Sequence, residues 1–190
     1  MKKTHVPIIV ALMASFLAGT GHPAWAKIIY VNAQAAGNAN GADWANAFTR
    51  IAPAMETAVD GDEIRVARGR YRGVVEMKPG TALYGGFAGT ESLREQRNGK
   101  GNETILDGGG SANSTVVTAE DTVLDGFTVT GGKQRGVWCQ KATFQMAHCL
   151  IQWNGEYGLV ISDFCKPSVT DCEISKNGRG VMCAARSTPT

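Results

Sequence analysis

The sequence has few aromatic residues and no long apolar segment after Ala26. Phe, Trp and Tyr make up 7% of the 190 residues, whereas glycine occurs 24 times. A chain that is short of large rings and rich in glycine favours short strands joined by tight turns over long helices. A membrane-spanning helix needs about 20 consecutive apolar residues. The sequence therefore predicts no stable membrane span once residues 1–26 are removed.

An excess of charge and the common metal-binding motifs are also missing. The whole chain has 19 basic residues; without Lys2 and Lys3, 17 basic residues face 17 acidic ones from Lys27 onward. A formally neutral chain offers no general electrostatic attraction for nucleic acid. No Cys-x-x-Cys motif and no closely spaced pair of histidines occurs, which excludes the usual zinc sites. We therefore expect neither nucleic acid nor zinc as a ligand.

Residues 1–26 have the layout of a secretory signal peptide. Lys2 and Lys3 supply positive charge, residues 8–19 are almost entirely apolar, and Ala24-Trp25-Ala26 is a small-x-small cleavage site. The residue directly after this site is Lys27 and not a cysteine, which argues against a bacterial lipid anchor. We expect the mature chain to begin at Lys27 and to be exported by a bacterium. It would then be secreted or held at the cell surface, with the periplasm as an alternative.

Two segments near the C-terminus repeat one another, and a third copy begins after them. The equivalent glycines Gly136, Gly158 and Gly180 lie 22 positions apart, and the pairs Cys149/Cys172, Ile151/Ile174 and Asn154/Asn177 lie 23 positions apart. Each copy contains short runs in which apolar and polar residues alternate, a pattern typical of strands with one buried face. A period near 22 with several short strands fits one coil of a β-solenoid.

In a solenoid, equivalent residues of successive coils stack in ladders about 4.8 Å apart. The predicted inward ladders are Val137, Leu159 and Val181, and Val129, Ile151 and Ile174. Asn154 and Asn177 are predicted to lie in a tight turn, in left-handed backbone geometry. Their side-chain amides would hydrogen-bond along the stack and satisfy polar groups of the turn.

A short helix is predicted before the first coil. One helical face would hold Phe48, Ile51, Ala52, Met55 and Val59. Pro53 would either limit the helix to a late start, so that the proline lies in its first turn, or kink it, and Gly61 would end it. An amphipathic helix at this place would cover the apolar end of the solenoid and prevent end-to-end aggregation.

The sequence resembles a known family at two levels. The run from Ile28 to Ser92 resembles the N-terminal part of secreted bacterial right-handed parallel β-helix proteins, with Trp-Ala-Asn-Ala, Gly-Asp-Glu-Ile and Tyr-Gly-Gly-Phe segments in that order. The Cys-x-Ile-x-x-Asn-Gly copies resemble the parallel β-helix repeats of pectin-lyase-like proteins. The resemblance implies this fold but no single activity, because the fold carries lyases, hydrolases, adhesins and scaffolds.

We therefore predict an all-β fold, a right-handed parallel β-helix with coils of about 22 residues and an N-terminal capping α-helix. Residues 1–26 would be the signal peptide, residues 27–63 the N-terminal strand and capping helix, and residues 64–190 the β-helix. The segment 187–190 matches the residues that precede the strand beginning at Val169. The β-helix is thus expected to be truncated in mid-coil.

The five cysteines allow two interpretations. Buried cysteines behave as small apolar residues, so Cys149 and Cys172 could form a thiol ladder in the core. Alternatively, these two could form a disulfide between adjacent coils, and no other pair has a favourable geometry. Cys139 and Cys183 would lie two coils apart, and Cys165 would lie exposed in a turn.

The best polar cluster predicted from the register consists of Asp125, His148 and Asp171. The ladder of Gly126, His148 and Asp171 would bring an imidazole and a carboxylate into contact beside Asp125. These three residues are weak candidates for catalysis, because a surface His–Asp pair at a turn is the simpler interpretation.

No resident metal or cofactor is evident. Calcium could still bind, either to carboxylates of a lyase-like site or to an acidic group around the helix (Asp43, Asp60, Asp62 and Glu63).

Two functions remain open, and the sequence does not decide whether the chain is an enzyme. The first is a non-catalytic surface scaffold, adhesin or glycan-binding module, whose partner would be a polysaccharide or a cell-surface glycan. The second is an extracellular polysaccharide lyase or glycoside hydrolase. The outward ladders hold one carboxylate, Asp125, in six positions, which favours the first.

Overall fold

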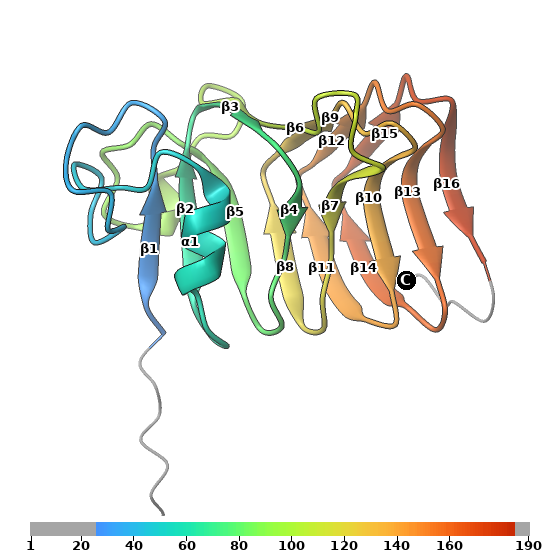
Figure 1. Cartoon of the computed structure of the whole chain (residues 1–190), viewed down its shortest axis with the longest axis horizontal. Coiled ribbons are helices and arrows are strands. Elements are labelled where there is room, and N and C mark those ends of the chain that lie inside the picture. Colours follow the sequence, from blue (N-terminus) through green and yellow to red (C-terminus); the bar gives the residue numbers. More distant parts are fainter. Residues whose placement is uncertain (1–25, 185–190) are drawn as a thin grey trace, which may run out of the picture.

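The computed structural model describes residues 26–184, which form three parallel β-sheets wound into a β-helix (Figure 1). The first sheet contains β1 (Ile28–Val31), β2 (Glu63–Ala67), β5 (Ala82–Phe87), β8 (Thr122–Asp125), β11 (Thr143–Ala147) and β14 (Lys166–Thr170). The second contains β3 (Gly69–Arg72), β6 (Thr104–Asp107), β9 (Thr128–Thr130), β12 (Leu150–Gln152) and β15 (Glu173–Ser175). The third contains β4 (Val75–Glu76), β7 (Ser114–Val117), β10 (Arg135–Gln140), β13 (Tyr157–Ser162) and β16 (Arg179–Cys183).

The strand pairing confirms the predicted register. Val137 pairs with Leu159, and Leu159 with Val181, each 22 positions apart. In the second sheet, Ile151 pairs with Val129, 22 positions earlier, and with Ile174, 23 positions later. Successive C-terminal coils therefore have nearly the same length, and equivalent residues stack as the repeat predicts. Figure 1 shows these coils side by side along the long axis of the molecule.

The core runs through the centre of the coils. One inward ladder of the first sheet consists of Ile64, Leu83, Leu124 and Met146, all at most 1% exposed and joined by the strand register. Alternation along each strand sends every second side chain inward. Burial of these apolar side chains supplies the main favourable free energy of the fold. The short alternating strands thus need the neighbouring coils to bury their apolar faces.

The predicted helix is present but shorter than expected. α1 spans Ile51–Thr57 and contains Pro53 in its first turn. Ile51 and Met55 are buried, as predicted, whereas Ala52 is exposed and Val59 is 58% exposed. The prediction for Ala52 and Val59 was wrong, as it was for Phe48, which precedes the helix and forms a β-bridge with Val31. The chain is already extended at Ala58, so Val59 lies beyond the helix, and the buried face turns toward Ala54 instead.

α1 packs against β1, β2 and β4. It lies beside the two-residue strand β4, at the N-terminal end of the solenoid (Figure 1). Its buried residues belong to the same core cluster as Ile29 and Val31 of β1. The helix therefore covers the core of the first coil, which agrees with the predicted capping role. Because β1 pairs with β2 in register, the first strand is continuous with the first sheet of the solenoid.

A long polar connection interrupts the coils between β5 and β6. Tyr84 and Asp125 are paired neighbours in the first sheet although they are 41 positions apart. The chain between them leaves the solenoid near Gly89, forms the short 3-10 helix η1 (Arg94–Gln96) and rejoins it at Thr104. Polar and charged residues predominate in this segment. It supplies one wall of the site described below.

The two ends of the sequence carry predictions that fall outside the described residues. The proposed signal peptide (1–26) lies almost wholly before residue 26. The segment 187–190, from which we predicted a truncation in mid-coil, lies after residue 184. Between residues 26 and 184, no helix is long and apolar enough to cross a membrane.

Candidate functional site

The three residues singled out from the register, Asp125, His148 and Asp171, lie together where the first sheet turns into the second. Asp125 is the last residue of β8, and His148 and Asp171 directly follow β11 and β14. Both His148 and Asp171 have a φ of 50°, and Gly126, at the same position one coil earlier, has a φ of 84°. Aspartate, asparagine and histidine tolerate this left-handed geometry better than most residues. The backbone geometry of the turn therefore explains in part why histidine and aspartate occupy positions 148 and 171.

Their side chains make a directed contact. His148 Nδ1 lies 2.9 Å from Asp125 Oδ1, and His148 Nε2 lies 3.8 Å from Asp171 Oδ2. The Asp125 side chain is only 12% exposed, whereas that of His148 is 59% exposed. A neutral imidazole that donates from Nδ1 to a carboxylate presents Nε2 as a base. The arrangement can hold and move a proton at Nε2, and the catalytic role of the three residues stays a prediction.

Arg97 is the member of this cluster that the sequence did not reveal. Its Nη2 donates to Asp125 Oδ2 at 2.7 Å, and its guanidinium lies over the Tyr84 ring. Arg97 belongs to the loop between β5 and β6, which stands outside the repeat. Register therefore says nothing about its position. The buried carboxylate of Asp125 is thus shared between an arginine and a histidine.

An open groove of about 740 Å³ runs beside this cluster. One wall comes from the loop, and the other comes from the turns that carry His148 and Asp171. The outer surface of the second sheet forms its floor. The lining residues include Arg97, Lys100, Glu103, Phe127, Thr128, His148, Cys149, Leu150, Asp171 and Glu173. The groove thus combines an apolar side chain on its floor, Leu150, with side chains that donate and accept hydrogen bonds.

Removing the charge of Arg97 should destabilise the protein. We expect Arg97→Met to lower the free energy of unfolding by about 2 kcal/mol, because it leaves the Asp125 carboxylate largely buried without its cation. Methionine removes the charge but keeps an unbranched apolar side chain beside Tyr84. Urea denaturation followed by circular dichroism measures the change. Arg72→Met is the matched control, since the Arg72 side chain is 79% exposed and should contribute less than about 0.5 kcal/mol. Equal effects of both variants would contradict the assignment.

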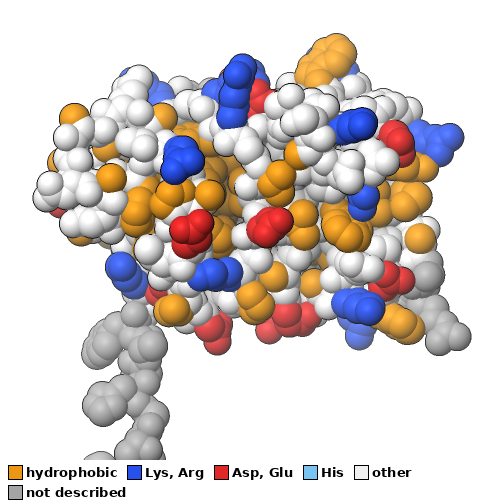
Figure 2. Space-filling model, viewed as in Figure 1, with side chains coloured by type: hydrophobic (Ala, Val, Ile, Leu, Met, Phe, Trp, Pro, Cys, Tyr) orange, Lys and Arg blue, Asp and Glu red, His pale blue; other side chains and the backbone are white. Residues whose placement is uncertain are grey.

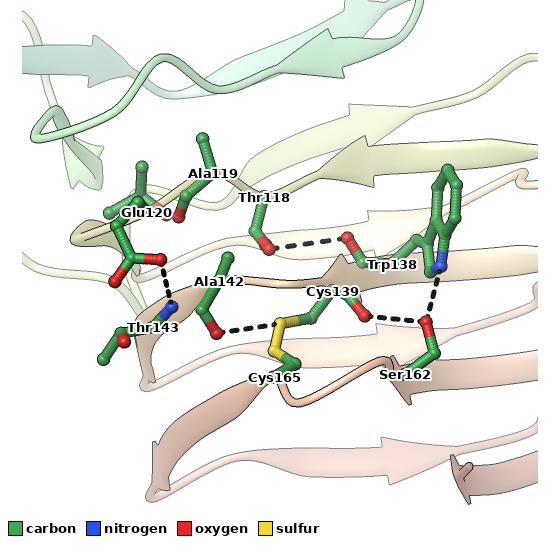
Figure 3. The surroundings of a disulfide bond; sticks show 10 residues. Thr118, Ala119, Glu120, Trp138, Cys139, Ala142, Thr143, Ser162 and Cys165 are labelled. Carbon is green, nitrogen blue, oxygen red and sulfur yellow. Dashed lines mark hydrogen bonds between the residues drawn. A yellow bond between two sulfur atoms is a disulfide. The ribbon is translucent and has the colours of Figure 1, made fainter. Parts of the chain in front are cut away.

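The cysteines agree with one expectation and contradict two others. Cys149 and Cys172 are free, as the thiol-ladder interpretation predicts, so the alternative disulfide between them is absent. The prediction that no other pair could bond was wrong, because Cys139 and Cys165 form a disulfide with Cα atoms 6.1 Å apart (Figure 3). Cys165 was also expected to lie exposed, yet it is fully buried. The corner before β14 passes through Asp163 and Phe164 in left-handed geometry, which turns Phe164 outward and Cys165 inward.

The register explains why these two cysteines meet. Thr143 pairs with Lys166, so Cys165 lies one coil above Ala142, an inward corner position. Cys139 is the last inward-facing residue of β10, just below this corner. Its sulfur lies 3.6 Å from the carbonyl oxygen of Ala142 (Figure 3). The bridge thus joins two positions that are not equivalent in the repeat. Comparison of equivalent positions alone could not find it.

The asparagine ladder is confirmed, with one correction. Asn154 Nδ2 donates to Asn177 Oδ1 at 3.0 Å, and the Gly132 amide donates to Asn154 Oδ1 at 2.9 Å. The left-handed residues are not the asparagines, however, but the preceding residues Trp153 and Lys176. Only 3% of Asn154 is exposed, so its amide satisfies polar groups inside the turn. The ladder is therefore a structural element of the fold.

Three of the acidic residues predicted around the helix, Asp43, Asp62 and Glu63, have local partners. Asp62 Oδ1 accepts the Lys27 amide and Glu63 pairs with Arg65 and Arg94. The Asn46 backbone amide and side chain hold the pKa of Asp43 below its usual value. Residues 26–184 contain no group of three or more His, Cys, Asp or Glu side chains able to hold a metal ion. The geometry therefore gives no support to a calcium site there.

Comparison with known proteins identifies the fold family. The family model described as a right handed beta helix region matches residues 61–190. No significant match is found among the curated proteins or among the solved structures. The matched segment includes all the strands from β2 onward and carries every residue of the groove. Together with the three parallel sheets, this match shows that the chain belongs to the right-handed β-helix family.

Proposed function

We propose that this right-handed β-helix domain is an exported bacterial module that binds a polysaccharide or cell-surface glycan, as part of a surface scaffold or adhesin. The groove beside Asp125 and His148 is the observation that carries the proposal. Binding sites for small molecules combine a concave apolar surface with a few convergent polar groups. The partly exposed Leu150 on the floor, bordered by charged side chains, supports such a site.

The chemistry of the groove suits a hydroxyl-rich ligand. Arg97 and Lys100 donate hydrogen bonds, Asp171 and Glu173 accept them, and the His148 imidazole can do either. Acidic and basic side chains are also interspersed over the opposite, α1-bearing face shown in Figure 2. Mixed charge of this kind favours a glycan over nucleic acid, which needs a continuous basic surface.

A glycan screen with matched variants tests the proposal. We expect the full chain to bind at least one polysaccharide, and Lys100→Ala and His148→Ala each to weaken that binding by about tenfold, since one lost hydrogen bond to a charged group is worth about 1.5 kcal/mol. Lys133→Ala removes the same charge from an exposed position outside the groove and should bind normally. Binding that is insensitive to the groove variants, or no binding at all, would reject the proposal.

A polysaccharide lyase or glycoside hydrolase is the second candidate. The hydrogen bond between His148 and the buried Asp125 favours it, because it orients Nε2 for proton transfer. Release of unsaturated or reducing ends by the full chain would distinguish this candidate from a binding module. In that case His148→Gln should reduce turnover by about 100-fold or more, the usual contribution of general acid–base catalysis, while binding persists.

A further inference from the structure

A second pair of sulfur atoms lies beside the groove. Cys149 and Cys172 occupy the same inward position on adjacent coils, directly before the paired residues Leu150 and Glu173. The Glu173 amide donates to the Cys149 carbonyl oxygen at 2.9 Å, and the Cys149 amide donates to Cys172 Sγ at 3.4 Å. Neighbouring strands are about 4.8 Å apart, and disulfides need Cα atoms about 4.4–6.8 Å apart. The backbone therefore permits a bond that is not formed.

The two thiols differ in surroundings and in acidity. Cys149 is 3% exposed, and burial raises its pKa well above the usual value. The Cys149 thiol hydrogen-bonds to the sulfur of Cys172 and, against the effect of burial, lowers the pKa of Cys172 to about 7. The Cys149 amide and the nearby charge of His148 act in the same direction. Cys172 is thus the member of the pair that holds a thiolate near neutral pH.

Cys172 is also the more accessible sulfur. It is only partly buried, whereas Cys149 is buried. By contrast, Cys139 and Cys165 are both fully buried and already bonded. Thiolate character and access together determine the reactivity of a cysteine. The two pairs therefore differ in the two properties that separate reactive from structural sulfur.

We propose that Cys149 and Cys172 are a redox-active pair that exchanges with disulfides, either small molecules or other proteins. The Cys172 thiolate attacks one sulfur of the incoming disulfide, forms a mixed disulfide and releases the first thiolate. Cys149, on losing its proton, attacks the Cys172 sulfur and releases the second thiolate. One incoming disulfide is thereby reduced to two thiols, and one Cys149–Cys172 disulfide is formed. This inference does not depend on glycan binding.

Disulfide mapping in glutathione buffers tests the pairing. The full chain carrying Cys183→Ser, which removes the remaining free thiol, is equilibrated with reduced and oxidised glutathione, quenched with acid, alkylated and analysed by mass spectrometry. We expect a Cys149–Cys172 bond in oxidising buffer that disappears in reducing buffer, with Cys139–Cys165 bonded throughout. With Cys149→Ala, a glutathione adduct should accumulate on Cys172. With Cys172→Ala, Cys149 should remain unmodified.

The pH dependence of alkylation tests the assignment of the attacking sulfur. In the native chain, Cys172 should reach half its maximal alkylation rate near pH 7, since the thiolate is populated above the pKa. In the urea-denatured chain the midpoint should move to about 8.5, the ordinary value for a thiol. Cys149→Ala should raise the native midpoint, because the chief hydrogen-bond donor is lost. Thiols that stay free in oxidising buffer, bonds to Cys139 or Cys165 instead, or a native midpoint at the denatured value would overturn the proposal.

Discussion

Asn154→Ala is expected to lower the free energy of unfolding by about 3 kcal/mol, because it leaves several buried polar groups without partners. The Asn154 side chain accepts from the Gly132 amide and donates to Asn177 Oδ1 and to the Val129 carbonyl oxygen. These groups lie inside the turn between the second and third sheets, where water does not replace the amide. Chemical denaturation monitored by circular dichroism measures the loss.

Two further asparagine variants serve as controls for this prediction. Asn177 is more exposed than Asn154 and lies in the last described coil, so Asn177→Ala should cost less. Asn113 is exposed and contributes no side-chain hydrogen bond to the ladder, so Asn113→Ala should change stability by less than about 0.5 kcal/mol. If the three variants were equally stable, the amide ladder would not support the turn.

Loss of the Cys139–Cys165 bond should have an effect of similar size. The two residues are 26 positions apart, and a closed loop of that length constrains the unfolded chain by about 3.5 kcal/mol in the chain-entropy description. We expect the double variant Cys139→Ala, Cys165→Ala to lose about this much free energy of unfolding. Reducing agent should lower the stability of the unmodified protein but not that of the double variant.

The free cysteines provide the matching control. In protein prepared with Cys149 and Cys172 reduced, as they are in the structure, alanine substitutions at both positions should leave the response to reducing agent unchanged. An unmodified protein whose stability is insensitive to reduction would show that the Cys139–Cys165 bond does not hold the third and first sheets together.

Much of the fold was predictable from the repeat. The spacing of Ile151 and Ile174 and of Asn154 and Asn177 predicted both the stacked coils and the amide ladder. A solenoid allows such predictions because each residue packs mainly against its equivalent one coil away. The proximity of His148 to Asp171 followed from the same register. The helix was less predictable at its C-terminal end, where the backbone becomes extended at Ala58.

The parts of the site that the repeat did not reveal lie outside equivalent positions. Arg97 reaches Asp125 from a loop that has no counterpart in other coils. Cys165 meets Cys139 across a corner, beyond the ladder partner Ile161. The left-handed turn residue is Trp153, not the asparagine that follows it. Each of these features depends on how the backbone bends between strands, for which periodicity holds no information.

The repeat was sufficient to predict the parallel β-helix, because alternating strands that recur at a short, nearly constant period can bury their apolar faces only by stacking coils. Which side chains meet across the corners and under the loop became known only from the folded chain. The tertiary structure placed Arg97 on Asp125, bonded Cys139 to Cys165 and left Cys149 and Cys172 as free thiols. The physical reason is that stacking repeats from coil to coil, whereas a corner or loop follows its own local backbone geometry.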